Sequence, residues 1–471
     1  MKRAIGSYLD DSPRSRRVSL TFLTAFAMLG CGLAGSVTPA GSSLAAANDI
    51  PHPDQARLRQ TVAALVRFGT RHTLSTTTDD HRGIGAARRW VADRFMADSA
   101  VCGRCLTIET IGDRFTGPRA PDGVRIEDVL AIQKGMTDPD RVVIVEAHID
   151  SRVNDVMDAT TDAPGANDDA SGVALVMEAA RLLSRRHFPA TIIYAVLSGE
   201  EQGLWGGELL ARTVKARGWQ VASVLNNDIV GNTHGIGGEH VDNRVRVFSE
   251  GIQTAADTTD IKTQRATGGE DDSPSRALAK AIVAQAAAHP AIGLMVRAVR
   301  RPDRFMRGGD HIPFLAEGFP AVRFTEAVED YDRQHQRVRV EDGRFYGDTI
   351  DFVDFPYLAR VTALNMIVLS NLASAPAAPV KATITGALSD DTTVTWASVP
   401  GAASYRVSWR LADGTAWTDH HVAPAGATSL VLKNVNIDDH FFGVSSVSAN
   451  GAQSLVTFAG MPPRPLPGHT H

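Results

Sequence analysis

Five short stretches of the chain combine histidine and carboxylate side chains in a way that could hold metal ions. In chain order they are His148 with Asp150, Asp168 with Asp169, Glu200 with Glu201, Asp228, and His311. Imidazole nitrogens and carboxylate oxygens are ligands that zinc accepts. A single catalytic zinc uses three protein ligands, whereas this set offers two histidines and at least three acids. The residue types therefore predict a site for two metals that share a bridging carboxylate.

Taken singly, each stretch has an ordinary structural explanation. A histidine after a strand is more often hydrogen-bonded within the fold than bound to a metal. Glu200 and Glu201 could open a helix, because carboxylates are stabilised near its positive end. In "PGANDDASGVALVMEAARLL" (164–183), Asp169 or Ser171 could cap the helix that the apolar spacing predicts. A cap accounts for only one of the two adjacent acids.

The elements that precede these stretches give them a common location. Short apolar runs predict buried strands at 128–132, 141–147, 190–198, 222–228 and 320–326. Helical spacing of apolar residues predicts helices at 53–68, 84–96, 170–186, 206–218, 273–289 and 357–373. Strands and helices alternate, which predicts an α/β domain over 48–375 with a mixed, largely parallel central sheet flanked by helices. In such sheets, ligand-binding groups gather at the carboxyl ends of the strands.

A second pattern follows residues 374–382, which have the composition of a linker. Beyond them, polar and apolar residues alternate between turn signals such as Asp413-Gly414, which predicts an all-β sandwich within 376–462. The segment resembles a fibronectin type III domain in Trp396, in "YRVSW" from Tyr405, and in "FGVSSVSANG". Such a domain could bind a cell wall, a polysaccharide or a protein surface, or act only as a spacer. Residues 463–471 are predicted to be a disordered tail.

The first 47 residues have the composition of a signal peptide. A basic start is followed by the apolar run "VSLTFLTAFAML" and by "SLAAAND", which predicts cleavage after Ala47. A membrane anchor is the alternative, because the uncharged run approaches the ~18 residues that a membrane span needs. The cleavage-like site favours export to the periplasm or the medium, with no membrane span in the mature protein.

Charge and cysteine content limit the partners of the exported chain. The 471 residues include 48 basic and 53 acidic ones; residues 1–47 hold five and two of these, which leaves 43 against 51 and a net charge of −8. No basic patch is present, so nucleic acid is not an expected partner. Cys102 and Cys105 predict a short disulfide, since a zinc ribbon would need a second pair and no thioredoxin-like context supports a redox role.

Together, the motifs resemble those of the co-catalytic di-zinc exopeptidases, which include secreted bacterial aminopeptidases and, more distantly, glutamate carboxypeptidase II. The matching motifs are His148-x-Asp150, the run from Gly165 to Gly172, Gly199-Glu200-Glu201, Asn227-Asp228 and Gly309-Asp310-His311. The resemblance covers roughly residues 52–372 and implies two zinc ions per chain.

The resemblance also implies a role for each motif residue. Asp168 would bridge the two zinc ions, with His148 and Asp228 completing one and Glu201 and His311 the other. Glu200 would be the general base, and the carboxylate of Asp150 would orient the His148 ring. The family usually has a cis peptide bond after the bridging acid, here Asp168–Asp169. Tyr331 and His335 fall in the region that follows the last ligand and are expected to be structural.

Several activities are compatible with this resemblance. An aminopeptidase acting on peptides with a free N-terminus is preferred; it needs carboxylates for the substrate amine, for which Asp228 and Glu326 are candidates. A carboxypeptidase would need basic residues aimed at a terminal carboxylate, such as Arg301, Arg304 and Arg307. A glutaminyl cyclase shares the fold but uses one zinc. A binding protein without activity would be expected to have lost a ligand or Glu200, and none is lost.

Overall fold

The computed structural model describes residues 52–460. The predicted signal peptide (1–47) and the predicted tail (463–471) lie outside the described residues. Within the described range, no helix combines the length and the apolar character that a bilayer crossing requires.

The helices of the described range mostly occupy the segments that helical spacing predicted. They are α1 (Gln55–Val66), α2 (Gly83–Val101), α3 (Ala170–Leu183), α4 (Glu200–Gly203), α5 (Trp205–Ala216), α6 (Thr258–Thr267), α7 (Pro274–Ala288), α8 (His311–Ala316) and α9 (Phe355–Ser374). Short 3-10 turns lie at η1 (Gly269–Asp272), η2 (Pro290–Ile292) and η3 (Ile350–Phe352).

The strands form one large sheet, a small hairpin and two sheets near the C-terminus. The large sheet contains β1 (Thr107–Gly117), β2 (Ala120–Gln133), β3 (Asp138–His148), β4 (Ala190–Leu197), β5 (Gln220–Asn227), β6 (Arg244–Phe248), β7 (Met295–Val299) and β8 (Ala321–Glu326). The hairpin pairs β9 (Arg339–Glu341) with β10 (Arg344–Tyr346). The C-terminal strands are β11 (Thr383–Thr385), β12 (Thr392–Thr395), β13 (Ser404–Leu411), β14 (Asp419–Pro424), β15 (Ser429–Leu432), β16 (His440–Val447) and β17 (Thr457–Phe458).

The large sheet is mixed, as the sequence predicted. Its strand order is β1-β2-β4-β3-β5-β8-β6-β7. The central strands β4, β3, β5 and β8 pair in parallel, while β1 and β2 add an antiparallel hairpin at one edge. At the other edge, β6 runs antiparallel to β8 and parallel to β7. The central parallel strands therefore end at a common edge of the sheet.

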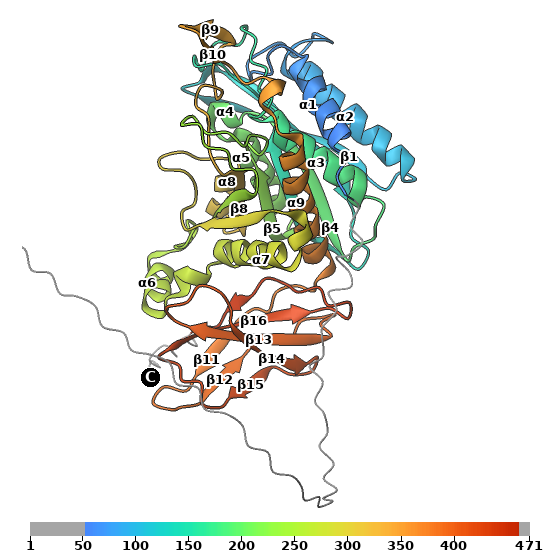
Figure 1. The fold of residues 1–471 in the computed structure, drawn as a ribbon. Coiled ribbons are helices and arrows are strands. Elements are labelled where there is room, and N and C mark those ends of the chain that lie inside the picture. Colours follow the sequence, from blue (N-terminus) through green and yellow to red (C-terminus); the bar gives the residue numbers. More distant parts are fainter. Residues whose placement is uncertain (1–51, 461–471) are drawn as a thin grey trace, which may run out of the picture. The chain divides into compact units, whose positions relative to one another are not determined.

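Helices cover both faces of this sheet (Figure 1). Along β3, Val143 and Val145 belong to one apolar core, while Val142 and Ile144 belong to another. This alternation places successive side chains on opposite faces, so a strand buried on both sides is apolar throughout. Helices α1, α2, α3, α7 and α9 contribute to the first core, and α5 and α8 contribute to the second. The domain thus has three layers, helix–sheet–helix.

The edge strands β1 and β7, and β6 next to β7, were not predicted from the sequence. Burial explains the two edge strands: β1 buries only Ile111 and Phe115, and β7 buries none of its residues. β6 is only five residues long, although three of them are buried. An edge strand that faces solvent carries mixed polar and apolar residues, and its periodicity is weak. The buried central strands have long apolar runs and were predicted within a few residues.

The C-terminal strands build a β-sandwich, in agreement with the predicted all-β segment. One sheet has the order β11-β12-β15 and the other β14-β13-β16-β17. Val394 of the first sheet shares a core with Tyr405 and Phe442 of the second. Trp396, noted in the sequence, packs against the Tyr405 ring with the ring centroids 5.4 Å apart. The likeness to a fibronectin type III domain stays a prediction.

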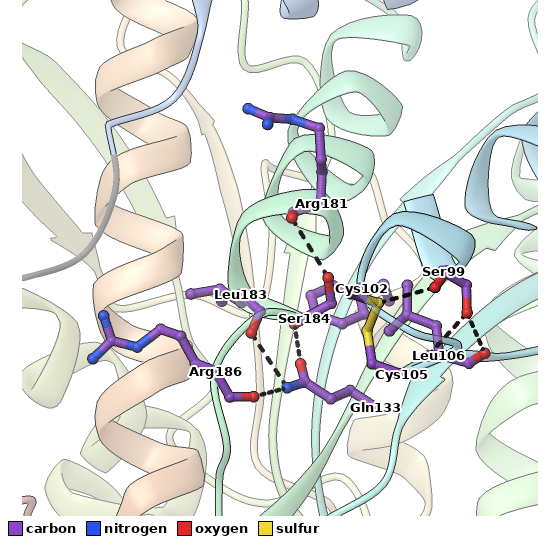
Figure 2. The surroundings of a disulfide bond; sticks show 10 residues. Ser99, Cys102, Cys105, Leu106, Gln133, Arg181, Leu183, Ser184 and Arg186 are labelled. Carbon is purple, nitrogen blue, oxygen red and sulfur yellow. Dashed lines mark hydrogen bonds between the residues drawn. A yellow bond between two sulfur atoms is a disulfide. The ribbon is translucent and has the colours of Figure 1, made fainter. Parts of the chain in front are cut away.

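Cys102 and Cys105 form a disulfide just after α2, which confirms the predicted pairing (Figure 2). The two cysteines are three positions apart in the sequence, and their Cα atoms are 5.6 Å apart. Next to it, the Ser99 hydroxyl donates to the carbonyl of Leu106 at 2.8 Å and accepts its N–H at 3.1 Å. The disulfide therefore staples the turn from α2 into β1.

Replacing Leu175 by alanine tests the buried face of α3. Leu175 is fully buried in the core between α3 and the sheet. We expect the variant to lose about 2–5 kcal/mol of unfolding free energy, because the cavity cannot fully collapse. Urea denaturation followed by circular dichroism measures this loss. Met96→Ala is the control, since Met96 is 51% exposed on α2; an equal loss in both variants would contradict the assigned core.

Candidate metal centre

The predicted site residues meet at the common edge of the parallel strands. His148 is the last residue of β3, Asp228 follows β5 directly, and Glu200 begins α4 just after β4. Because β4, β3 and β5 are neighbours that run in the same direction, their carboxyl ends lie side by side. Sheet topology alone thus gathers residues that are up to 80 positions apart in the chain.

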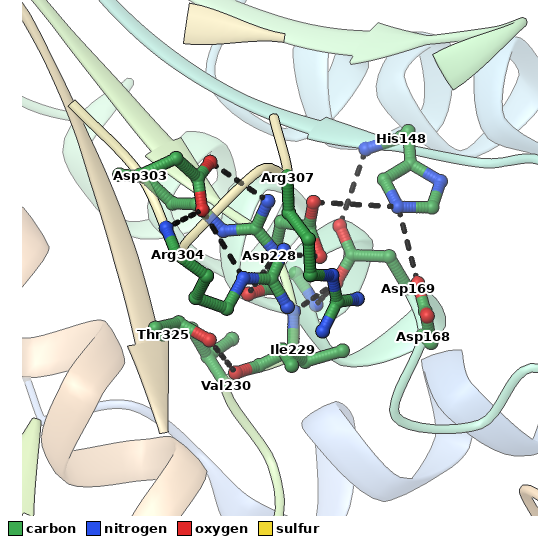
Figure 3. Close-up of polar contacts among 12 residues, drawn as sticks. His148, Asp168, Asp169, Asp228, Ile229, Val230, Asp303, Arg304, Arg307 and Thr325 are labelled. Atoms are coloured by element: carbon green, nitrogen blue, oxygen red, sulfur yellow. Dashed lines mark hydrogen bonds and ion pairs between the residues drawn. The ribbon is translucent and has the colours of Figure 1, made fainter. Parts of the chain in front are cut away.

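Two groups of donor atoms lie at this edge. The first donor group is His148, Glu200 and Asp228, and the second donor group is Asp168, Glu201 and His335. Within each group the ligand atoms all lie within 4.8 Å of one another. Asp168 touches both groups: its Oδ1 is 3.2 Å from His148 Nε2, and its Oδ2 is 3.0 Å from His335 Nε2. Figure 3 shows the His148 ring directed at Asp168 and Asp228.

His335 occupies the place that the sequence prediction gave to His311, and the structure corrects that prediction. His335 Nε2 lies 3.0 Å from Glu201 Oε1 as well as from Asp168. The His311 ring is fully buried at the start of α8, with Nε2 2.8 Å from the carbonyl oxygen of Pro302. Asp303 and Arg323 lie between this ring and Asp228. His311 is therefore part of the packing behind the site.

The donor atoms present fit zinc ions. Each group supplies one imidazole and two carboxylates, a combination that zinc accepts. Glu201 Oε1 is buried and makes no hydrogen bond of acceptable geometry within the described residues, although His335 Nε2 is near. A buried carboxylate oxygen without a hydrogen bond is costly unless a cation lies beside it.

Asp169 fixes the loop that carries Asp168. Its carboxylate accepts the N–H of Gly172 at 3.0 Å, which caps α3, and also the N–H groups of His148 at 3.2 Å and Ile229 at 3.3 Å. The peptide bond between Asp168 and Asp169 is cis, as the resemblance implied. A Cβ atom at Gly172 would lie 2.1 Å from the carbonyl oxygen of Asn227, so only glycine lets α3 approach β5 this closely.

Asp150 supports the site differently from the prediction. His148 Nδ1 donates to the backbone carbonyl of Asp150 at 3.0 Å, whereas the Asp150 carboxylate is 3.6 Å from that nitrogen. The carboxylate instead accepts the Glu201 N–H at 3.1 Å, the Glu200 N–H at 3.3 Å and the Thr73 hydroxyl at 2.8 Å. Asp150 therefore orients His148 through its main chain and α4 through its side chain.

Asp348 and Arg71 also hold the bridging loop, and sequence reasoning missed both. Asp348 accepts the N–H of Asp168 at 2.7 Å and that of Asn167 at 2.9 Å. Arg71 is fully buried and donates to the carbonyls of Ile149 and Gly165 at 2.7 and 2.9 Å. Nothing local marks either residue, because each acts on a segment about 80 or more positions away.

Two arginines stand behind the donor carboxylates. Arg323 Nη2 lies 2.7 Å from Asp228 Oδ1, and Arg152 Nε lies 2.7 Å from Glu201 Oε2. Arg152 Nη2 is also 2.7 Å from His335 Nδ1. Each arginine leaves the other oxygen of its carboxylate facing the donor group, so these pairs orient the ligands.

A pocket of about 460 Å³ opens over the donor atoms. Asp168, Glu200, Glu201, Asp228 and His335 are among its lining residues. Glu326 is not: it is buried and accepts from Asn167 Nδ2 at 2.8 Å and from the Asn232 N–H at 3.2 Å, so it does not face a substrate amine. Tyr331 does not line the pocket either and is 54% exposed.

Comparison with known proteins places the chain in a family. Residues 128–346 match the family model described as "Peptidase family M28". A probable zinc metalloprotease of Leptosphaeria maculans is 43% identical over 86% of this chain and 93% of that protein. One of Pyricularia oryzae is also 43% identical, over 88% of this chain and 83% of that protein. The chain belongs to peptidase family M28.

Solved structures with a similar fold include two kinds of enzyme. The Legionella pneumophila LapA aminopeptidase covers 70% of this chain and 74% of its own, with a TM-score of 0.49 and 19% identity. The Porphyromonas gingivalis glutaminyl cyclase covers 67% of this chain and 98% of its own, with a TM-score of 0.48 and 16% identity.

The pKa values of three residues show how much negative charge is gathered at this M28 site. Burial opposes the charged form of His335, but Glu201 and Asp168 outweigh it and raise its pKa to about 10. Burial likewise opposes charge on His148, yet contacts with Asp150, Asp168 and Asp228 hold its pKa well above the usual range. Burial raises the pKa of Glu200, and the neighbouring Asp228 and Glu201 add to the rise. A field that favours protons this strongly also favours a divalent cation.

Parallel His→Gln variants separate the two candidate histidines. We expect His335→Gln to lower the zinc bound per chain, because the second donor group loses its only imidazole. His311→Gln should keep the wild-type zinc content, since its ring contacts a backbone carbonyl instead. Metal analysis after exhaustive dialysis measures both, and far-UV circular dichroism checks the folding. Loss of zinc only in His311→Gln would reverse the assignment.

Proposed function

We propose that this chain is an exported, zinc-dependent aminopeptidase with two zinc ions per chain. The observation that supports two metals is the position of Asp168, whose two carboxylate oxygens each contact the histidine of a different donor group. Two complete donor groups joined by one carboxylate are what a co-catalytic pair requires. The motif resemblance to secreted aminopeptidases and the M28 family match support peptide hydrolysis.

The metal-holding residues divide between the two groups. His148 and Asp228 would hold one zinc ion, Glu201 and His335 the other, and Asp168 both. When bound, the two ions would polarise the scissile carbonyl and lower the pKa of the attacking water. His148 can serve because its Nδ1 donates to a carbonyl, which leaves Nε2 for the metal.

Glu200 would act as the general base. Glu200 lines the pocket and belongs to the first donor group. Of the two adjacent glutamates, Glu201 is the one whose carboxylate Arg152 holds in place, so we assign the metal to Glu201 and the proton transfer to Glu200. Its raised pKa suits a group that takes a proton from the attacking water and then gives it to the leaving amine. The main-chain N–H groups of Glu200 and Glu201 are both fixed by Asp150, so the base has a defined position.

The remaining parts of the proposal concern the context of the enzyme. Export rests on the signal-peptide composition of residues 1–47, and the substrates would be peptides with a free N-terminus. The β-sandwich would contact a cell surface or polysaccharide, or hold the peptidase at a distance. A carboxypeptidase of the same fold is the second candidate, because Arg304 and Arg307 line the pocket, whereas Arg301 does not.

Blocking the substrate amine tests the aminopeptidase assignment. We expect aminoacyl p-nitroanilides to be cleaved and their N-acetylated counterparts to be cleaved at least about 100-fold more slowly. Pre-incubation with a chelator should abolish cleavage, and added zinc should restore it. Equal rates on blocked and free substrates would contradict the aminopeptidase, and activity that survives metal depletion would contradict the metal requirement.

Glu200→Gln separates the base from the ligands. The variant should retain wild-type zinc, because the amide preserves shape and Glu200 is not one of the proposed ligands. Its kcat should fall by about 10²–10⁴-fold, the contribution typical of a general base. Glu208→Gln is the control, since Glu208 is a half-exposed residue on α5 whose carboxylate pairs with Arg212 and does not line the pocket. Loss of zinc in Glu200→Gln would mean that Glu200 is a ligand.

A further inference from the structure

Two adjoining hollows lie between α1 and α2. The smaller hollow has a volume of about 220 Å³ and the larger one about 620 Å³, and Ala64, Arg67 and Trp90 line both. Neither hollow shares a lining residue with the pocket over the donor groups. Together the two hollows form the α1–α2 groove, which is separate from the metal centre.

One stripe of each helix builds the smaller hollow. Residues three and four positions apart share a face of a helix, and the lining residues follow this spacing. The opposite face of each helix belongs to the apolar core, and Figure 1 shows both helices on the same side of the large sheet. The stripe residues are Arg57, Gln60, Thr61 and Ala64 on α1, and Trp90 and Arg94 on α2.

Three arginines surround the smaller hollow, and no acid lines it. Arg57 and Arg67 are exposed, and Arg94 is half-buried. Within residues 52–460, none of the three guanidinium groups has a hydrogen bond or an ion pair. Like charges around one hollow repel one another, and an anion placed among them would relieve the repulsion. No run of basic residues marks this cluster in the sequence, because its arginines come from two helices.

The acid nearest in electrostatic terms does not compensate this charge. Burial raises the pKa of Asp98, although the charges of Arg94 and Arg57 oppose the rise. Neither arginine forms an ion pair with Asp98 within the described range. The positive charge therefore stays available to a ligand in the smaller hollow.

Trp90 lies where the two hollows meet. Its side chain is half-buried and packs against the apolar core, while the rest of the indole lines both hollows. The indole N–H has no hydrogen-bond partner among the residues that the structure describes. Trp90 thus offers the groove an apolar ring with a free donor. Such a combination matches a sugar ring, which has apolar C–H faces and polar hydroxyl groups.

The larger hollow is mixed in charge. Asp80, His81, Arg89 and Asp93 line it, and Arg89 lies 3.3 Å from Asp80. Carboxylates accept hydrogen bonds from hydroxyl groups but repel phosphates and other anions. The groove as a whole therefore suits a ligand with an anionic group at one end and neutral hydroxyl groups beside it.

We propose that the α1–α2 groove binds an anionic saccharide. Arg57, Arg67 and Arg94 hold its carboxylate or sulfate group, because guanidinium groups match both oxyanions. Trp90 packs against the sugar ring, and the hydroxyl groups of the next unit reach the larger hollow. This site goes beyond the proposed peptidase function and does not depend on it.

A nucleic acid suits the groove less well than a saccharide. Its phosphates repeat at every nucleotide, so some of them would meet the two acids of the larger hollow. The formal net charge of the whole chain is −5, which also opposes the approach of a long polyanion.

Matched oligosaccharides test the charge requirement by isothermal titration calorimetry on the full chain. One pair is the galacturonate tetramer and its methyl ester, and the other is a sulfated galactan tetrasaccharide and its desulfated form. We expect at least one charged member to bind with a Kd below ~1 mM and about 10-fold or more tightly than its neutral partner. Added salt should weaken this binding. The pair that shows the preference identifies the anionic group.

Variants connect the binding to the groove. Arg57→Gln and Arg94→Gln should each weaken binding of the charged oligosaccharide by about 3–10-fold, and the double variant should weaken it further. Arg59→Gln is the matched control on the same helix: its guanidinium lies over the Phe355 ring at 4.2 Å, and Arg59 lines neither hollow. Thermal melting followed by circular dichroism checks that the variants are folded.

Several results would overturn the proposal. They are no binding of either charged oligosaccharide, equal binding of the charged and neutral members, and binding that is unchanged in both arginine variants, which would place the saccharide elsewhere on the chain. Inorganic sulfate that binds as tightly as the oligosaccharides would leave an oxyanion site without saccharide recognition. Tighter binding of a thymidine tetranucleotide would make the groove a nucleic-acid site. None of these outcomes depends on whether the chain cleaves peptides.

Discussion

The crowding of acids at one edge of the sheet is the constraint on which the rest of the site depends. Asp168, Glu200, Glu201 and Asp228 lie within two neighbouring donor groups, in a place where carboxylates interact strongly because water is scarce. Arg323 and Arg152 offset part of this charge from behind. In the described part of the chain, the other oxygens of Asp228 and Glu201 and both oxygens of Asp168 face His148 or His335 instead of an arginine. The fold therefore brings together a set of negative charges that favours the binding of cations.

A second set of aspartates explains how the ligands keep their positions. The N–H of His148 is bound by Asp169, that of Glu201 by Asp150, and that of Asp168 by Asp348. In each case a buried carboxylate outside the donor groups holds the main chain of a ligand residue. These acceptors are buried, where a hydrogen bond is costly to leave unmade. The donor side chains are thus positioned through their backbone, and their carboxylate and imidazole groups stay directed at the site.

The sequence predicted the parts of this arrangement that the sheet imposes. Apolar runs located β3, β4 and β5, and the residues that follow such strands must meet at one edge, so His148, Glu200 and Asp228 could be grouped before the structure was known. His335 could not, because it lies in a loop without periodicity and adopts a left-handed backbone conformation with φ of 54°. Asp348 is 180 positions from Asp168 and has no local signal. The spacing of apolar residues in the sequence gives no information about contacts that loops make across the fold.

The donor residues and two of the arginines that line the pocket come from different parts of the chain. The donor residues sit at the ends of the central strands or in loops that aspartates hold, whereas Arg119 lies in the tight turn between β1 and β2, and Arg307 lies between β7 and α8. Neither turn is needed to bring the donor groups together. The chain as a whole is acidic, with a formal net charge of −5, yet the pocket is lined by four arginines as well as by four acids. The net charge of the whole chain therefore does not describe the pocket, where arginines and acids are equal in number.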